Sequence, residues 1–271
     1  MTSDRNCDHS ICLSEEIKIN VISNIFTPPN IETLSVVVPI FDECDNIMPL
    51  LEEIHAALEE LNLDFEVIFV DDGSRDETPQ RLKAAKTTYP RLRFLRLAEN
   101  CGQSTATRVG VEAARSTWVV TLDGDGQNDP AGILDLIAAF PGVTGELPPL
   151  ITGVRRHRND NLLRRISSRV ANNVRRGILK DVTPDTGCSL KLFTRQAFLT
   201  LPFFDHMHRF IPALYRQLGG EIILVDVNHR PRGSGVSKYG LGNRLWVGLA
   251  DLAGVFWLGT RAKRPIIEEE D

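Results

Sequence analysis

The stretch 34–72, LSVVVPIFDECDNIMPLLEEIHAALEELNLDFEVIFVDD, decides the fold, because it contains a complete strand, helix and strand. Its ends, 34–40 and 65–72, are apolar runs rich in β-branched residues, as in strands buried on both faces. The segment 46–61 between them predicts an amphipathic helix. Its apolar residues share one helical stripe: Ile47, Leu50, Leu51, Ile54, Leu58 and Leu61.

The same alternation continues along the chain with short links. Further helices are expected at 76–89, 103–116, 129–140, 161–179 and 209–219, and further strands at 91–97, 117–123, 187–193 and 221–229. This pattern predicts an α/β fold with a mostly parallel sheet and helices on both faces. In such sheets ligands bind beyond the carboxyl ends of the strands. No GxGxxG follows the first strand and no GxxxxGK[ST] occurs, which argues against ordinary dinucleotide and P-loop sites.

Composition describes an ordinary soluble globular chain of 271 residues, with 42% hydrophobic residues and a net charge of -5, so nothing global suggests nucleic-acid binding. We expect an extension over 1–33, one domain over 34–240, and an apolar helix with an acidic tail over 241–271. The five cysteines show no disulfide or zinc spacing, which suits a reducing cytosol. The N-terminus has no signal-peptide pattern.

Two segments are candidates for contact with a membrane surface. Eight arginines lie between Arg155 and Arg176, and most fall on the predicted helix 161–179. A solvated face packed on the sheet is the alternative. The apolar segment 245–260 is too short to span a bilayer and contains Asp251, so it predicts an interfacial or buried helix. Burial in a homo-oligomer is its alternative.

The loop LDGDGQND (122–129) follows an apolar strand and carries the most informative chemistry. Asp123, Asp125 and Gln127 offer oxygen ligands to a hard divalent cation, and the glycines let a bulky ligand approach. A solvated acidic turn is the alternative for the D-x-D alone. Asp129 precedes a proline and is expected to cap the next helix.

Other polar residues are predicted to share this edge. Asp71 and Asp72 either cap the following helix or accept from a base or ribose, and Glu43 with Phe41 could hold a base, although ordinary packing explains Phe41 equally well. The downstream stretch HRPRGSGVSKYG (229–240) combines cations with glycines and favours phosphate contact over a structural loop.

Six motifs, in this order and spacing, resemble family 2 glycosyltransferases, and within them the polyprenyl-phosphate branch that includes dolichol-phosphate mannose synthases and undecaprenyl-phosphate sugar transferases. The motifs are VVVPIFDECDNI, VDDGSRDET, LAENCGQSTATRVG, LDGDGQNDP, DTGCSLKLF and HRPRGSGVSKYG. The resemblance covers about 34–240 and implies a GT-A fold, a UDP- or GDP-linked sugar donor and a polyprenyl phosphate acceptor.

The resemblance also implies roles for individual residues. The donor nucleotide would be bound by Pro39, Phe41, Glu43, Asp72, Gln103 and Asp123, and Mg²⁺ or Mn²⁺ by Asp125 and Gln127. Phosphate or lipid phosphate would be bound by a further seven residues. Arg155, Arg164 and Ser168 would bind the acceptor phosphate, Lys191 would contact phosphate, and Arg232, Ser237 and Lys238 would close over the site. Of these residues, Asp125, Arg155, Arg164 and Lys191 would be catalytic. Lys191 stands where relatives usually carry Arg, and Gln103 where many carry Lys.

The expected reaction is therefore inverting transfer of a sugar to a polyprenyl phosphate, catalysed by a cytoplasmic protein held peripherally at the cytoplasmic face of the membrane. Such an acceptor is already an anion and needs no strong base, and none is evident beside the D-x-D. Two alternatives stay open. One is a GT-A enzyme with a soluble acceptor; the other is a non-catalytic module that binds a nucleotide sugar or a lipid phosphate.

Overall fold

The computed structural model describes residues 31–61, 63–142, 147–155, 175, 177–179, 183–231 and 244–261, with only the backbone for 244–246. The predicted extension 1–33 lies outside the described residues up to position 30. So do most of the predicted Arg-rich helix 161–179 and the loop 232–240. Arg164, Ser168, Arg232, Ser237 and Lys238 belong to these segments.

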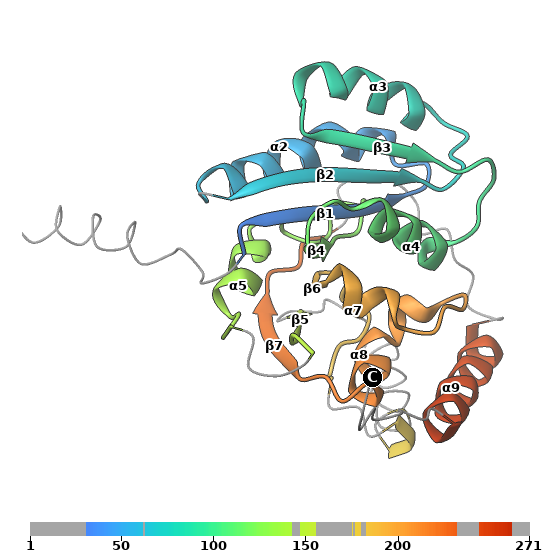
Figure 1. Cartoon of the computed structure of the whole chain (residues 1–271). Helices are drawn as coiled ribbons and strands as arrows, with labels where there is room; N and C mark the ends of the chain where they lie inside the picture. The colour runs from blue at the N-terminus through green and yellow to red at the C-terminus, as the bar shows by residue number, and fades with distance from the viewer. Residues whose placement is uncertain are drawn as a thin grey trace, which may run out of the picture.

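A seven-stranded sheet forms the centre of the molecule, in the order β3-β2-β1-β4-β6-β5-β7 (Figure 1). Its strands are β1 (Thr33–Ile40), β2 (Asp64–Asp71), β3 (Leu92–Arg96), β4 (Trp118–Thr121), β5 (Leu150–Arg155), β6 (Lys191–Thr194) and β7 (Ile222–Val227). All neighbours are parallel except β6, which runs antiparallel to β4 and β5. The predicted mostly parallel α/β sheet is confirmed.

Strand β1 aligns the carboxyl ends of its two neighbours, β2 and β4, at one edge of the sheet. It pairs along its length with β2, ending at Ile40 opposite Asp71, and with β4 on its other side, where Val37 lies opposite Thr121. Because all three strands are parallel, their carboxyl ends meet at one edge. The loops that begin at Phe41, Asp72 and Leu122 therefore leave the sheet side by side.

The described helices and short 3-10 turns cover both faces of the sheet. They are η1 (Cys44–Asn46), α2 (Ile47–Glu59), α3 (Thr78–Thr88), α4 (Gln103–Ala113), α5 (Gly132–Ala138), α7 (Arg195–Leu199), η2 (Met207–Arg209), α8 (Ile211–Gln217) and α9 (Arg244–Arg261). One apolar core joins α2, α3 and α5 to the sheet, and a second joins α4, α7, α8 and α9 to it. In β1, Val36 and Val38 enter the first core and Val37 the second, as alternation along a strand requires.

Sequence patterns missed two elements, β5 and α7. Strand β5 contains Gly153, where a Cβ would lie 2.8 Å from a methyl of Val227, so close packing there excludes a larger side chain and interrupts the apolar run. Helix α7 has only five residues, too few to show a periodicity. The antiparallel direction of β6 also has no local signal. Gly219, the last residue of the predicted helix 209–219, has a φ of 76°, a left-handed conformation that commonly ends a helix.

Helix α9 agrees with the prediction for 245–260. Leu252 and Val255 are buried, whereas Leu249, Phe256 and Trp257 are 44, 49 and 57% exposed. It lies beside α8 (Figure 1). Within the described part of the chain, no helix has the length and apolarity needed to cross a membrane.

Candidate active site

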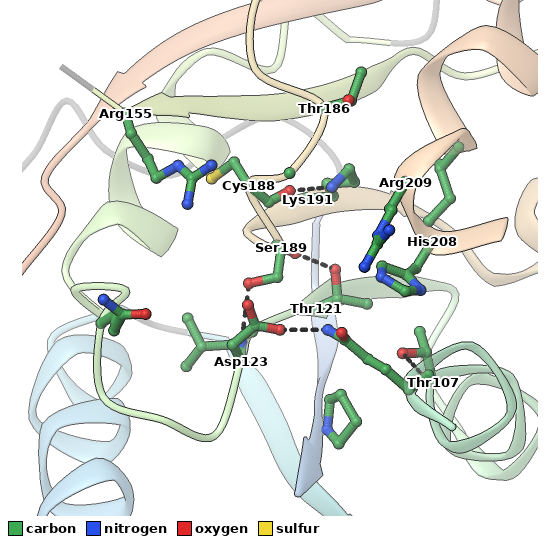
Figure 2. Close-up of a pocket in the computed structure, with 16 residues that line it drawn as sticks. Thr107, Thr121, Asp123, Arg155, Thr186, Cys188, Ser189, Lys191, His208 and Arg209 are labelled. Carbon is green, nitrogen blue, oxygen red and sulfur yellow. Dashed lines mark hydrogen bonds between the residues drawn. The ribbon is translucent and has the colours of Figure 1, made fainter. Parts of the chain in front are cut away.

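A cavity of about 460 Å³ opens at the carboxyl edge of the sheet (Figure 2). It lies between the acidic loop after β4, the start of α4, the end of β5, the segment before β6 and the turn η2. Its lining residues are Pro39, Gln103, Thr107, Thr121, Leu122, Asp123, Gln127, Arg155, Thr186, Gly187, Cys188, Ser189, Lys191, His208, Arg209 and Ile211.

Six residues singled out from the sequence meet in this cavity: Pro39, Gln103, Asp123, Gln127, Arg155 and Lys191. Four others, Phe41, Glu43, Asp72 and Asp125, lie in loops of the same edge but outside the lining. Asp185, Ser104, His208 and Arg209, which the structure brings to the site, were not predicted.

Asp123 lines the cavity and contacts both the start of α4 and the segment before β6. One carboxylate oxygen accepts a hydrogen bond from the Gln103 amide at 2.6 Å, and its backbone N–H donates to the Ser189 hydroxyl at 3.1 Å. Burial, and then the neighbouring charge of Asp125, raises the pKa of Asp123 to about 6. Two carboxylates this close favour a bound cation.

The acidic loop has a shape that only its glycines permit. A Cβ on Gly124 would come 2.2 Å from a methyl of Ile40, and Gly126 has a φ of 72°. The backbone N–H of Gln127 donates to the Asp125 carboxylate at 3.1 Å, which closes a tight turn between the two residues expected to bind the metal. Among described residues, no group of three His, Cys, Asp or Glu side chains could hold a metal.

A second contact ties this loop to the end of β7. The Arg230 backbone donates to the Gln127 carbonyl at 2.8 Å, and the Arg230 guanidinium pairs with Glu53 and Asp129, each at 2.8 Å. The sequence grouped Arg230 with the cations of 229–240, which favour phosphate contact. In the structure its charge is engaged by two carboxylates, and a role in phosphate contact stays a prediction. Asp129 also accepts from the Ala131 N–H at 3.1 Å, just before α5. The N-cap of α5 is Ala131 and no described side chain caps the helix, so the expected capping by Asp129 is not observed.

Asp72 organises the start of α4 rather than the helix that follows it. Its carboxylate accepts from the backbone N–H groups of Cys101 and Gly102, at 2.7 and 2.9 Å, and from the Asn100 amide. Gly102 has a φ of 90° directly before Gln103. Asp72 therefore helps to aim Gln103 at Asp123.

Arg155, the last residue of β5, is held by a fork of two hydrogen bonds. Its Nε and Nη2 donate to the two oxygens of Asp185 at 2.6 and 2.7 Å. This contact raises the pKa of the Arg155 guanidinium against the opposing effect of burial. A bidentate pair fixes the plane of the guanidinium. The only local sign of Asp185 was its place in the motif DTGCSLKLF.

Lys191 begins β6 and is 2% exposed. It lies opposite Thr121 and Thr152 in the sheet, and its ammonium donates to the Cys188 carbonyl. Burial lowers the pKa of Lys191, while the charges of nearby acidic groups, Asp123 among them, oppose that effect. Lys191 is therefore a buried basic side chain that lines the cavity.

The fold and the cavity together define the structural class of the protein. A mixed sheet of this order, with an acidic loop and basic side chains around one cavity at the carboxyl edge, is the GT-A fold of glycosyltransferases. Solved structures agree with this class. Mannosyl-3-phosphoglycerate synthase from Rubrobacter xylanophilus is 16% identical with a TM-score of 0.63, over 88% of this chain and 78% of that one. Glucosyl-3-phosphoglycerate synthase from Mycobacterium tuberculosis, with Mn²⁺, UDP and glucosyl-3-phosphoglycerate, is 22% identical with a TM-score of 0.60, over 84 and 80%.

The chain belongs to glycosyl transferase family 2, whose model matches residues 35–201. It is 37% identical over 237 residues to a dodecaprenyl-phosphate galacturonate synthase from Rhizobium johnstonii, covering 85% of this chain and 68% of that protein. It is 32% identical over 214 residues to an undecaprenyl-phosphate 4-deoxy-4-formamido-L-arabinose transferase from Aeromonas hydrophila, covering 78 and 64%. The chain thus spans about two thirds of the length of these curated relatives, and its resemblance to the polyprenyl-phosphate branch is confirmed.

Proposed function

We propose that this chain transfers a sugar, with inversion, from a nucleoside diphosphate sugar to a polyprenyl phosphate at the cytoplasmic face of a membrane. The two curated relatives are named for dodecaprenyl phosphate and undecaprenyl phosphate, each with a sugar. We assign the activity to a catalytic domain over 34–240 and the membrane contact to 161–179 and 241–271.

One observation carries the proposal: an acidic loop and two basic side chains, the half-buried Arg155 and the buried Lys191, share a single cavity. Asp123 and Gln127 line its donor side, and Arg155 and Lys191 line the other. A donor bound against the loop would have its leaving diphosphate near the expected cation site. An acceptor phosphate bound by Arg155 and Lys191 would then face the sugar from the opposite side, as a single inverting displacement requires.

The described lining offers no free general base, which suits a phosphate acceptor. Asp123 is the lining carboxylate, and it already accepts from Gln103. The Nδ1 of His208 is engaged by Ser104. A phosphate monoester is ionised at neutral pH and attacks without losing a proton, so catalysis reduces to positioning and charge stabilisation.

Asp125 and Gln127 are the proposed ligands of Mg²⁺ or Mn²⁺. Two protein oxygens suit a cation that takes its remaining ligands from substrate phosphates and water. The raised pKa of Asp123 beside Asp125 supports this placement, since a cation there would offset the repulsion between the carboxylates. When bound, the cation would neutralise the leaving nucleoside diphosphate. The related fold from Mycobacterium tuberculosis was solved with Mn²⁺ and UDP.

The remaining assignments follow the family motifs. We propose that Pro39, Phe41, Glu43, Asp72, Gln103 and Asp123 form the donor nucleotide side, for a UDP- or GDP-linked sugar. We propose that Arg164, Ser168, Arg232, Ser237 and Lys238 complete the phosphate side with Arg155 and Lys191. The exposed apolar face of α9 supports a peripheral membrane contact, with homo-oligomer burial as the alternative.

A lipid-transfer assay tests the proposal. Radiolabelled UDP- and GDP-sugars would be incubated with the protein, Mg²⁺ or Mn²⁺, and undecaprenyl or dolichyl phosphate in detergent. The proposal predicts label in the organic phase with at least one donor. Label found only in water-soluble products would favour a soluble-acceptor enzyme. Donor binding without turnover would favour a non-catalytic module.

A further inference from the structure

The short turn η2 contributes two basic residues, His208 and Arg209, to the cavity, and no motif predicted either of them. Figure 2 shows both across the cavity from Arg155. The turn follows a left-handed residue, His206, with a φ of 65°, and it is fixed by burial of Met207 and Phe210 in the second core. A wall held this firmly can present side chains to a substrate in a defined position.

The guanidinium of Arg209 has no partner in the described part of the chain. Among the residues that the structure describes, no carboxylate lies within ion-pair distance of it and no acceptor within hydrogen-bond distance. Other arginines that are withdrawn from solvent are paired, as Arg93 is with Glu66 at 2.5 Å and Arg155 with Asp185 at 2.6 Å. A partly buried cation without a partner, in the wall of a cavity, is costly unless a ligand supplies the anion.

The lining of the cavity has more basic than acidic side chains, which favours binding of an anion. Its described lining holds the cations Arg155, Lys191 and Arg209 but only one carboxylate, Asp123. Asp185, behind the lining, balances Arg155. Lys191 is hydrogen-bonded to a neutral carbonyl and makes no ion pair among the described residues. The described lining therefore supplies no carboxylate partner for Arg209, because its one carboxylate, Asp123, accepts from Gln103 instead.

His208 completes this wall as a neutral hydrogen-bond donor. The Ser104 hydroxyl accepts from the His208 backbone N–H at 3.2 Å and lies 2.7 Å from Nδ1. Because no other acceptor for the Ser104 proton is found among the described residues, Ser104 donates to Nδ1, which leaves the proton of the ring on Nε2. Burial, with Arg209 and Lys191 nearby, lowers the pKa of His208 to about 3, so the ring carries no charge at neutral pH.

We propose that Arg209 is a substrate-binding residue that pairs with an oxyanion, beside the neutral N–H of His208. This inference rests on the proposed function. The oxyanion is either a carboxylate carried by the transferred sugar or the phosphate of the acceptor, because a guanidinium binds both by the same two-pronged geometry. Arg209 thus either selects acidic sugars or holds the attacking phosphate.

The test compares Arg209→Met and Arg209→Lys with Arg216→Met. Arg216 lies on α8, exposed and outside the cavity, so it controls for loss of one positive charge. Transfer to undecaprenyl phosphate would be measured with UDP-glucose and with UDP-glucuronate, giving KM for donor and acceptor and kcat. Circular dichroism would verify that each variant is folded.

We expect Arg209→Met to raise one KM about ten- to hundred-fold, the loss typical of a charge-assisted hydrogen bond, with partial recovery in Arg209→Lys and no change in Arg216→Met. A raised acceptor KM with both donors identifies the phosphate. A raised donor KM with UDP-glucuronate alone identifies the sugar carboxylate. Both KM values within twofold of wild type, or a loss confined to kcat that lysine does not recover, would overturn the proposal.

Equilibrium binding separates this inference from the proposed function. Dissociation constants for UDP-glucose, UDP-glucuronate and undecaprenyl phosphate would be measured on the same variants. If the wild type transfers no sugar to the lipid but Arg209→Met still weakens binding of one oxyanion probe, the proposed function fails and the role of Arg209 stands. If Arg209→Met binds every probe as the wild type does, or if the wild type binds none of them, the role of Arg209 is refuted.

Discussion

Inside the cavity, the charge of each residue depends on its neighbours. Asp123 has a pKa raised to about 6 by burial and by Asp125, whereas His208 has a pKa lowered to about 3 by burial and nearby cations. The carboxylate therefore begins to take up a proton just below neutral pH, while the imidazole stays neutral. This combination places an acid that titrates near pH 6 and a neutral imidazole in the lining of one cavity.

His208 should make the protein less stable in acid. Its folded pKa lies below the unfolded value of about 6.5, so the unfolded chain binds a proton that the folded chain does not, and stability falls as pH drops below about 6.5. His208→Asn, which keeps an acceptor for Ser104, should remove about 1–2 kcal/mol of the loss between pH 7 and pH 5. Urea unfolding at both pH values measures it. The raised pKa of Asp123 has the opposite effect on stability in acid, but this effect is equal in the wild type and in His208→Asn. An unchanged pH dependence of stability in His208→Asn would contradict the lowered pKa of His208.

The pair formed by Arg155 and Asp185 should be strongly coupled. The two side chains are 17 and 7% exposed, so Asp185→Asn would leave a mostly buried guanidinium unpaired and cost about 3 kcal/mol. It should also raise the acceptor KM, because the fork would no longer orient Arg155. Chemical unfolding of both single variants and of Arg155→Met with Asp185→Asn gives the coupling energy. Additive effects would show that the pair does not hold Arg155 in place.

The sequence predicted those residues of the cavity that lie at the carboxyl ends of the parallel strands. Asp123, Gln127 and Pro39 could be placed because parallel strands bring their carboxyl ends to one edge. Ser104 and His208 could not, because their contact joins residues 104 positions apart through a turn with no periodic pattern. The pairing of Arg230 with Glu53 could not be predicted either, since the two residues are 177 positions apart.

At the scale of elements, the acidic loop depends on close packing against β1. A Cβ at Gly124 would lie 2.2 Å from Ile40 and 3.1 Å from the Pro39 carbonyl, so Gly124→Ala must displace the loop. We expect a loss of about 1–3 kcal/mol in the free energy of unfolding and a weaker affinity for the cation that we propose. Thermal denaturation and a Mg²⁺ titration of activity measure both effects.

Gly248 provides the matched control for this change. It lies in α9, where an added Cβ would meet nothing within 4 Å. Gly248→Ala should leave cation affinity unchanged and stability equal or slightly higher, because alanine favours a helix. Wild-type cation affinity in Gly124→Ala would mean that the loop does not need its observed shape.

Helix α9 should contribute to membrane binding through its exposed face. Phe256 and Trp257 are 49 and 57% exposed, next to buried Val255, and such aromatic side chains favour the membrane interface. Phe256→Ser with Trp257→Ser should reduce flotation with anionic liposomes at low salt without affecting the fold. Sedimentation velocity distinguishes the alternative: if the double variant floats normally but changes its oligomeric state, the face is a protein contact.

On the scale of the whole molecule, one sheet brings two kinds of chemistry together. The parallel strands β1, β2 and β4 deliver acidic loops, and the antiparallel β6, inserted between β4 and β5, brings Lys191 and the segment with Asp185 against them. The class of fold followed from the alternation of strands and helices. The position of β6 in the sheet could not be predicted, because the sequence of a four-residue strand indicates neither which strand it pairs with nor in which direction it runs.

The central claim is cation-dependent sugar transfer to a polyprenyl phosphate, and lipid-linked label formed by Asp125→Asn tests it most directly. Asp135→Asn is the control, because Asp135 is an exposed carboxylate on α5 outside the cavity. With the best donor, the wild type and Asp135→Asn should form labelled lipid with Mg²⁺ or Mn²⁺ and none with EDTA. Asp125→Asn should lose about 100-fold or more of that rate while remaining folded. Equal rates in all three proteins, or full activity in EDTA, would contradict the account.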